Sequence, residues 1–242
     1  MRRKVLITGA SRGIGRSIAL KCAQSGDFNR IIINCRNNLL LLQDAAQRIK
    51  DTNPNIECFT SLGDVGDIEY VKTLKKEIGS VDVIVNNAAI SYTGLIIDMT
   101  PEEWNTTITT NLTSVYNTCH VFLPDMISKR SGHIINLSSV WGKVGASCEV
   151  AYSTTKGAIN AFTKSLAKEM GPSKVQVNAL ALGIVDTDMN NHLNSAEKSE
   201  IVDDIPMGRM LTPDEVGSAV LNLLNMPPYF TGEIVKLDGG WI

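Results

Sequence analysis

The chain has 242 residues, of which 43% are hydrophobic and 20% charged, so it can bury a sizeable core and is long enough for one α/β domain. A formal net charge of -2 with scattered basic residues argues against a nucleic-acid-binding face and against a polybasic membrane patch. Five cysteines without a CxxC pair, and only three histidines, favour reduced buried thiols and no metal site.

Short β-branched runs alternate with longer stretches of helical periodicity along the whole chain. Seven strands are predicted at residues 4–8, 30–35, 56–60, 81–86, 133–138, 175–181 and 233–239. Helices are predicted at residues 14–25, 39–50, 67–78, 102–128, 151–170 and 213–225. Several strands are apolar on both faces, which predicts a doubly wound parallel sheet with helices on both sides, in a single domain spanning residues 1–242. The first apolar run, residues 5–7, is too short for a signal peptide or a membrane span, so we expect a cytoplasmic protein.

The first chemical motif is TGASRGIG, residues 8–15, between the first predicted strand and the first predicted helix. Its glycines permit a tight turn and a close approach of the backbone, so that a pyrophosphate can sit among the free N–H groups of the helix N-terminus. We therefore predict a nucleotide-binding loop. Its contacting residues are expected to be Gly9, Ser11, Arg12, Gly13, Ile14 and Gly15.

The end of the second strand indicates which dinucleotide would bind. A site for NAD usually carries a carboxylate there for the ribose 2′-hydroxyl, but this strand ends in Asn34-Cys35-Arg36. Arg36, together with Arg12 in the glycine loop, offers two guanidinium groups, which suit a 2′-phosphate better than a hydroxyl. The sequence therefore predicts NADP(H) as the cofactor.

Two further strand ends carry candidate cofactor contacts. Asp64 and Val65 follow the third strand, where a carboxylate and a backbone N–H could contact the adenine edge; the alternative for Asp64 is a helix N-cap. Asn87, Ala88 and Ala89 follow the fourth strand, at the edge of a parallel sheet where ligands bind. The alternative there is a turn that uses the conformational tolerance of asparagine.

The predicted helix at 102–128 has an apolar stripe with Asn111 on or beside it. A buried amide is costly without partners, so Asn111 requires a structural water, a backbone carbonyl or a function.

Tyr152 and Lys156 lie one helical turn apart at the start of the predicted helix 151–170. A phenol has a pKa of about 10, and a neighbouring cation favours the phenolate, so we expect Lys156 to lower the pKa of Tyr152 and make it a usable acid and base. Ser139, at the end of the fifth strand, could hydrogen-bond the same carbonyl oxygen and orient it. The alternative is that Tyr152 and Lys156 are solvated surface neighbours.

The segment 186–206 is polar and has no strand signal. It is interpreted as a lid near a site, or alternatively as a solvated helical loop.

Together these motifs resemble the short-chain dehydrogenase/reductase family over essentially the whole chain. The matching positions are Thr8, Gly9, Gly13 and Gly15 of the glycine motif, the segment NNAA, and a catalytic tetrad of Asn111, Ser139, Tyr152 and Lys156. The resemblance implies a seven-stranded Rossmann sheet in which Tyr152 protonates a carbonyl while hydride arrives from the nicotinamide. It also implies that Lys156 holds the nicotinamide ribose and that Asn111 positions a water. Gly183, Ile184 and Thr187 would lie near the nicotinamide, with Thr187 at its carboxamide.

Within the family the chain is most similar to the 3-oxoacyl-acyl-carrier-protein reductases, which implies reduction of a 3-oxoacyl thioester in fatty acid synthesis. Lys129, Arg130 and Lys174 fall at or next to positions that would face an acidic carrier protein, although exposed basic residues are common. The resemblance also implies a homotetramer, with a four-helix contact built from residues 102–128 and 151–170.

Three residues depart from the usual pattern around the substrate: Ala89 replaces a glycine, Leu182 replaces a proline, and Glu149 stands where an uncharged amide is common. These departures concern the expected substrate wall and leave the catalytic residues unchanged. A reductase or dehydrogenase of free ketones, sugars or steroids is the first alternative. A non-catalytic dinucleotide-binding sensor is the second.

Overall fold

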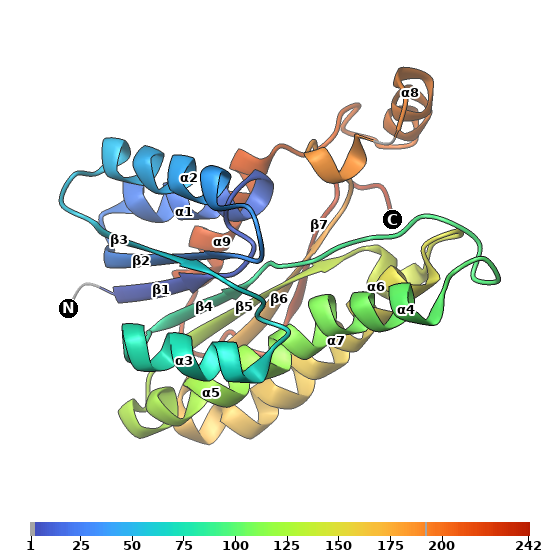
Figure 1. Ribbon diagram of the computed structural model, residues 1–242. Coiled ribbons are helices and arrows are strands. Elements are labelled where there is room, and N and C mark those ends of the chain that lie inside the picture. The colour runs from blue at the N-terminus through green and yellow to red at the C-terminus, as the bar shows by residue number, and fades with distance from the viewer. Residues whose placement is uncertain (1–2, 192) are drawn as a thin grey trace.

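Seven strands form one parallel sheet in the computed structural model, which describes residues 3–191 and 193–242 (Figure 1). The strands are β1 (Arg3–Ile7), β2 (Phe28–Cys35), β3 (Glu57–Leu62), β4 (Val83–Asn86), β5 (Gly132–Ser139), β6 (Val175–Leu182) and β7 (Ile234–Leu237). Their order is β3-β2-β1-β4-β5-β6-β7, so the direction of winding reverses between β1 and β4. Such a reversal opens a crevice at the carboxyl ends of the strands. The predicted doubly wound parallel sheet is confirmed.

Helices cover both faces of this sheet (Figure 1). The longer ones are α1 (Gly13–Ser25), α2 (Leu39–Thr52), α3 (Ile68–Ile78), α4 (Pro101–Ile108), α5 (Ser114–Lys129), α7 (Val150–Met170), α8 (Ser195–Asp203) and α9 (Pro213–Leu224). A short helix α6 (Trp141–Val144), a π-helical turn η1 (Thr109–Thr113) and two 3₁₀ turns, η2 (Gly171–Ser173) and η3 (Asp188–Asn190), complete the described elements. Helices α1, α2 and α9 pack on one face of the sheet, and α3, α5 and α7 pack on the other.

The strands alternate their side chains between two apolar cores. Val5 and Ile7 of β1 belong to the core under α1, α2 and α9, whereas Leu6 belongs to the core under α3, α5 and α7. All three side chains are fully buried. Because both faces are apolar, the strands read as continuous hydrophobic runs in the sequence.

The predicted helix at 102–128 is interrupted. The chain forms α4, then the π-helical turn η1, and then α5, with Asn111 at the centre of η1. A π-helical turn contains one extra residue per turn and locally displaces the backbone, and it is often found at functional sites. Apolar periodicity does not predict this π-helical turn, because the hydrophobic stripe continues on both sides of it.

The polar segment 186–206 contains η3 and α8, and α8 projects away from the sheet (Figure 1). No described residue of α8 is buried. One residue of the segment, His192, lies outside the described residues. None of the helices in the described part of the chain is long and apolar enough to cross a bilayer.

Candidate active site

The glycine loop packs directly against the residues that follow β4. Gly9 and Gly13 have positive φ angles of 64° and 53°. A Cβ atom on Gly9 would lie 2.8 Å from Ala88 Cα, and one on Gly15 would lie 2.4 Å from the Gly9 carbonyl oxygen. The loop therefore admits only glycine at these positions. The first turn of α1 has no side-chain cap and no acidic residue, so its N–H groups suit the pyrophosphate of a dinucleotide.

Asn87 joins this loop to the end of β4. Its side-chain Nδ2 donates to the carbonyl oxygens of Thr8 and Gly9, at 2.9 Å in each case. The backbone N–H groups of Asn87 and Ala88 both donate to Thr8 Oγ1, at 3.0 and 3.1 Å. Asn87 thus holds the loop in place, which the sequence did not reveal. Ala88 and Ala89 are partly exposed at the same edge of the sheet.

The two arginines predicted to bind a 2′-phosphate are both accessible. Arg36 pairs with Asp64 at 4.0 Å, and Arg12 pairs with Asp188 at 3.4 Å. Their side chains are 46% and 59% exposed, so both guanidinium groups can reach a ligand.

Asp64 does not cap the following helix. Its carboxylate accepts a hydrogen bond from Gly66 N–H at 2.7 Å, and the N-cap of α3 is Asp67. The N-cap alternative for Asp64 is therefore wrong. The neighbouring Val65 is a buried core residue, 4% exposed.

Ser139, Tyr152 and Lys156 meet where β5 ends and α7 begins. The Ser139 side chain lies close enough to Tyr152 to act on the pKa of its phenol, and both residues line the same cavity. Lys156 Nζ lies 5.3 Å from the centroid of the Tyr152 ring and donates to the Leu137 carbonyl oxygen at 2.8 Å. The predicted proximity of these three side chains is thus present in the structure.

The expected direction of the Tyr152 pKa is wrong. Burial raises the pKa of Tyr152 above its usual value because it deprives a phenolate of hydration. The negative charge of Glu149 raises the pKa further, and the neighbouring Ser139 side chain opposes both effects. Burial also lowers the pKa of Lys156 to about 8. Tyr152 is therefore a protonated phenol at neutral pH, ready to donate rather than accept a proton.

The side chain of Asn111 forms hydrogen bonds with the backbone of Ile90. Its Oδ1 accepts from Ile90 N–H and its Nδ2 donates to the Ile90 carbonyl oxygen, both at 2.8 Å. Nδ2 also donates to Thr155 Oγ1 at 3.2 Å. The amide thereby ties the loop after β4 to η1 and α7, and both of its hydrogens are used. Its role in holding a water stays a prediction.

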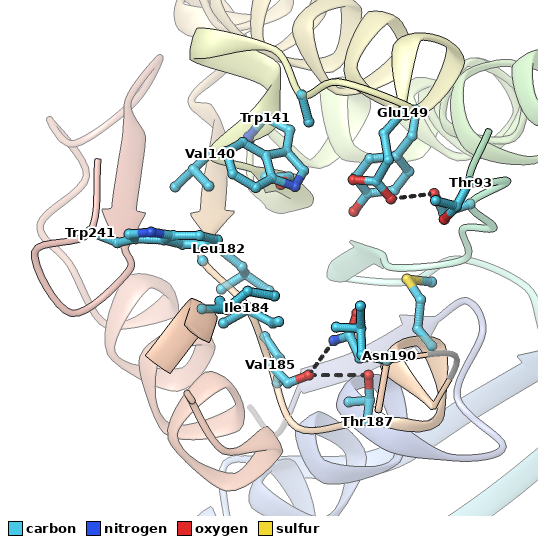
Figure 2. A pocket seen from close by; sticks show the side chains of 18 of the residues that line it. Thr93, Val140, Trp141, Glu149, Leu182, Ile184, Val185, Thr187, Asn190 and Trp241 are labelled. Atoms are coloured by element: carbon cyan, nitrogen blue, oxygen red, sulfur yellow. Dashed lines mark hydrogen bonds between the residues drawn. The ribbon is translucent and has the colours of Figure 1, made fainter. Parts of the chain in front are cut away.

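A cavity of about 300 Å³ opens beside Ser139 and Tyr152 (Figure 2). Ile14 of the glycine loop, Gly183, Ile184 and Thr187 also line it, so the predicted cofactor and catalytic segments converge on one space. Gly183 packs closely against the residue that follows β7, because a Cβ there would lie 2.9 Å from Asp238 Cα.

Sequence reasoning missed the aromatic wall of this cavity. Trp141 of α6 and Trp241 near the C-terminus pack edge to face, with ring centroids 5.0 Å apart and an interplanar angle of 63°. Both rings line the cavity (Figure 2). The two residues are far apart in the chain, and no local pattern could have paired them.

The three basic residues predicted to face a carrier protein lie at the other edge of the sheet. Lys129 ends α5, Arg130 follows it, and Lys174 directly precedes β6. All three are exposed. Ser139 lies at the far end of the eight-residue strand β5, so about 25 Å of strand separates the two edges.

A parallel sheet with a glycine loop at its winding reversal, and a Ser-Tyr-Lys group at the same edge, defines an oxidoreductase that uses a nicotinamide dinucleotide. The model of the family described as short chain dehydrogenase matches residues 3–198. The chain belongs to the short-chain dehydrogenase/reductase family.

Several proteins are similar to this chain over its full length. An uncharacterized oxidoreductase, YmfI, from Bacillus subtilis is 39% identical, with 100% of this chain and 99% of that protein covered. The 3-oxoacyl-[acyl-carrier-protein] reductase FabG of Chlamydia trachomatis is 38% identical, with 98% and 96% covered. A crystal structure of a 3-oxoacyl-[acyl-carrier protein] reductase with bound NAD from Brucella melitensis superposes with a TM-score of 0.90 at 33% identity, covering 99% of this chain and 91% of that one.

Proposed function

We propose that this protein catalyses the NADPH-dependent reduction of a 3-oxoacyl thioester, carried by an acyl carrier protein, to the 3-hydroxyacyl form. The observation that carries the proposal is the protonated Tyr152, beside Ser139, at a cavity that reaches Ile14 of the glycine loop. Relatives named 3-oxoacyl-acyl-carrier-protein reductases support the substrate class.

In this mechanism the substrate carbonyl oxygen accepts hydrogen bonds from Ser139 and Tyr152. The bound dinucleotide supplies the hydride that reduces the carbonyl carbon. Tyr152 transfers its proton to the carbonyl oxygen, which gives a secondary alcohol and leaves a phenolate. Lys156, while charged, stabilises that phenolate across the short distance between them.

The preference for NADPH rests on Arg12 and Arg36 and on the absence of a carboxylate at the end of β2. The Brucella melitensis structure has NAD bound. The preference of this chain is therefore a matter for measurement with both coenzymes.

Carrier-protein binding by Lys129, Arg130 and Lys174 requires a second copy of the chain. These residues lie at the edge of the sheet opposite the cavity. An antiparallel contact through α5 and α7 in a homotetramer would bring them toward the cavity of a neighbouring copy. The proposal of a carrier-linked substrate and the proposal of a tetramer therefore depend on each other.

A second candidate function is the reduction of a free cyclic or aromatic ketone. The observation that favours it is the wall formed by Trp141 and Trp241, which offers a flat apolar surface. A non-catalytic sensor is disfavoured, because a sensor has no need for Ser139, Tyr152 and Lys156 to meet beside the cavity.

The test follows NADPH oxidation with acetoacetyl thioesters of a carrier protein and of coenzyme A, and with cyclic ketones. We expect the highest kcat/KM for the carrier-linked thioester, and a lower kcat/KM with NADH than with NADPH. In Tyr152→Phe the proton donor is lost, so kcat should fall by about 10²- to 10⁴-fold while the affinity for NADPH stays unchanged. A higher kcat/KM for cyclic ketones, or for NADH, would overturn the corresponding part of the proposal.

A further inference from the structure

Glu149 occupies an unusual position at the start of α7. It is the N-cap residue of that helix, where an acidic side chain would ordinarily accept a hydrogen bond from the first turn, yet its side chain forms no such cap. Instead, the Glu149 side chain lines the cavity (Figure 2), which Tyr152 lines as well. One carboxylate oxygen accepts a hydrogen bond from Ser91 Oγ at 2.8 Å. The carboxylate is thus directed toward the substrate space rather than toward its own helix.

The charge of this carboxylate is not neutralised by a partner. Its side chain has Ser91 as its single hydrogen-bond partner and forms no ion pair within the described part of the chain. The nearest cation along α7, Lys156, is buried and donates to the Leu137 carbonyl oxygen. An ionised carboxylate offers about four acceptor positions, so most of those of Glu149 are available to a ligand.

Glu149 also acts on the reacting hydroxyl. Its negative charge is one of the causes that raise the pKa of Tyr152, so the carboxylate lies within electrostatic reach of the proton donor. A substrate whose carbonyl oxygen contacts Tyr152 therefore feels the same negative charge. A second anion in this cavity would be repelled, whereas an N–H or O–H donor would be attracted.

We propose that Glu149 is a specificity-determining residue, which rejects 3-oxo carboxylates in favour of neutral 3-oxo compounds such as thioesters and amides, and which most favours a substrate with an N–H or O–H donor near the carbonyl. This inference rests on the proposed reductase function and refines its substrate class. The aromatic wall of Trp141 and Trp241 borders the cavity too, so the substrate would have an apolar side facing the indoles and a donor facing Glu149 (Figure 2).

The test compares acetoacetate with acetoacetamide, two molecules of nearly the same size. Acetoacetate carries an anionic carboxylate where acetoacetamide carries a neutral amide with N–H donors. We expect the unchanged protein to prefer acetoacetamide by at least about tenfold in kcat/KM, which corresponds to about 1.4 kcal/mol. Glu149→Gln, which keeps the shape and removes the charge, should bring this ratio close to one. Glu169→Gln removes the same charge from an exposed position on the same helix and should leave the ratio unchanged.

The variant Ser91→Ala distinguishes an effect of the Glu149 charge from an effect of cavity shape. This variant removes the hydrogen-bond partner of Glu149 but keeps the carboxylate, so it should retain the preference for acetoacetamide. A ratio close to one in Ser91→Ala would show that the preference comes from cavity shape, and it would overturn the inference. An unchanged ratio in Glu149→Gln would overturn it as well.

A binding measurement distinguishes failure of this inference from failure of the proposed function. Trp141 and Trp241 line the cavity, so occupancy by either ligand should change tryptophan fluorescence without any turnover. If the protein oxidises no NADPH with any thioester, but binds acetoacetamide more tightly than acetoacetate in a manner abolished by Glu149→Gln, the reductase proposal fails and the selectivity stands. Equal affinities in the unchanged protein and in Glu149→Gln would reject the selectivity, whatever the thioester activity.

Discussion

Tyr152 and Lys156 are one helical turn apart, and burial acts on them in opposite directions. Removing water disfavours the charged form of each group, so it raises the pKa of the phenol and lowers that of the ammonium. The Tyr152 phenol consequently stays protonated near neutral pH. The charge on Lys156 is the component of this pair that changes within a few pH units of neutrality.

This difference predicts the pH dependence of the reductive reaction. The pKa of Lys156 is lowered from 10.5 to about 8, so its positive charge is present below about pH 8 and is lost above it. Because that charge stabilises the phenolate left after proton transfer, kcat/KM for reduction should fall as the pH rises through 8. With saturating NADPH, the value at pH 9 should be about a tenth of that at pH 7. A profile that stays level up to pH 9.5 would contradict a role for the Lys156 charge.

The position of α7 depends on its contact with α6. A Cβ atom on Gly142 of α6 would lie 2.6 Å from the Lys156 carbonyl carbon and 2.9 Å from Gly157 N. Asn160 Nδ2 also donates to the Gly142 carbonyl oxygen at 3.1 Å. Helix α7, which carries Tyr152 and Lys156, thus packs directly against the backbone of Gly142. This close contact fixes the two functional side chains relative to the end of β5.

Gly142→Ala should therefore impair stability and activity together. Forcing a methyl group into this contact should cost about 1–3 kcal/mol of unfolding free energy, which for a chain of this length lowers Tm by about 2–4 °C per kcal/mol. Displacement of Lys156 should also reduce kcat. Gly171→Ala is the matched control, because nothing lies within 4 Å of a Cβ there and its φ of -51° suits alanine. Calorimetry and NADPH oxidation measure the two effects, and an unperturbed Tm in Gly142→Ala would refute the contact.

At the scale of the whole molecule, the cavity and the three basic residues lie at opposite edges of the sheet. The carboxyl edge gathers the glycine loop, the Ser-Tyr-Lys group and the cavity, whereas Lys129, Arg130 and Lys174 lie at the amino edge. A carrier protein bound to Lys129, Arg130 and Lys174 would be separated from the cavity of the same copy by about 25 Å of strand. If these residues bind the carrier, we expect the cavity of a neighbouring copy to accept its thioester.

Charge reversal at the amino edge tests this expectation. Lys174→Glu should raise KM for the carrier-linked thioester by about fivefold at low ionic strength, with the effect declining as salt is added. KM for the coenzyme A thioester should not change, because no carrier contact is involved. Lys50→Glu makes the same charge change at the end of α2 and serves as the control. Light scattering should find four copies per particle; a monomer with full carrier-dependent activity would exclude the proposed arrangement.

Local patterns in the sequence were sufficient to predict the sheet, the glycine loop and the proximity of Ser139, Tyr152 and Lys156. Strand and helix periods act over a few residues, and the glycines of the loop are required by their own backbone geometry and close packing, so each leaves a readable local signal. The spacing of Tyr152 and Lys156 is likewise a property of one helical turn.

Only the tertiary structure decided features that depend on distant partners. It paired Asn111 with Ile90, placed Trp241 against Trp141, and directed Glu149 into the cavity instead of its own helix. It also reversed the expected direction of the Tyr152 pKa. The physical reason is that burial sums contributions from every element packed around a group, whereas sequence spacing reports only the neighbours along its own helix or strand.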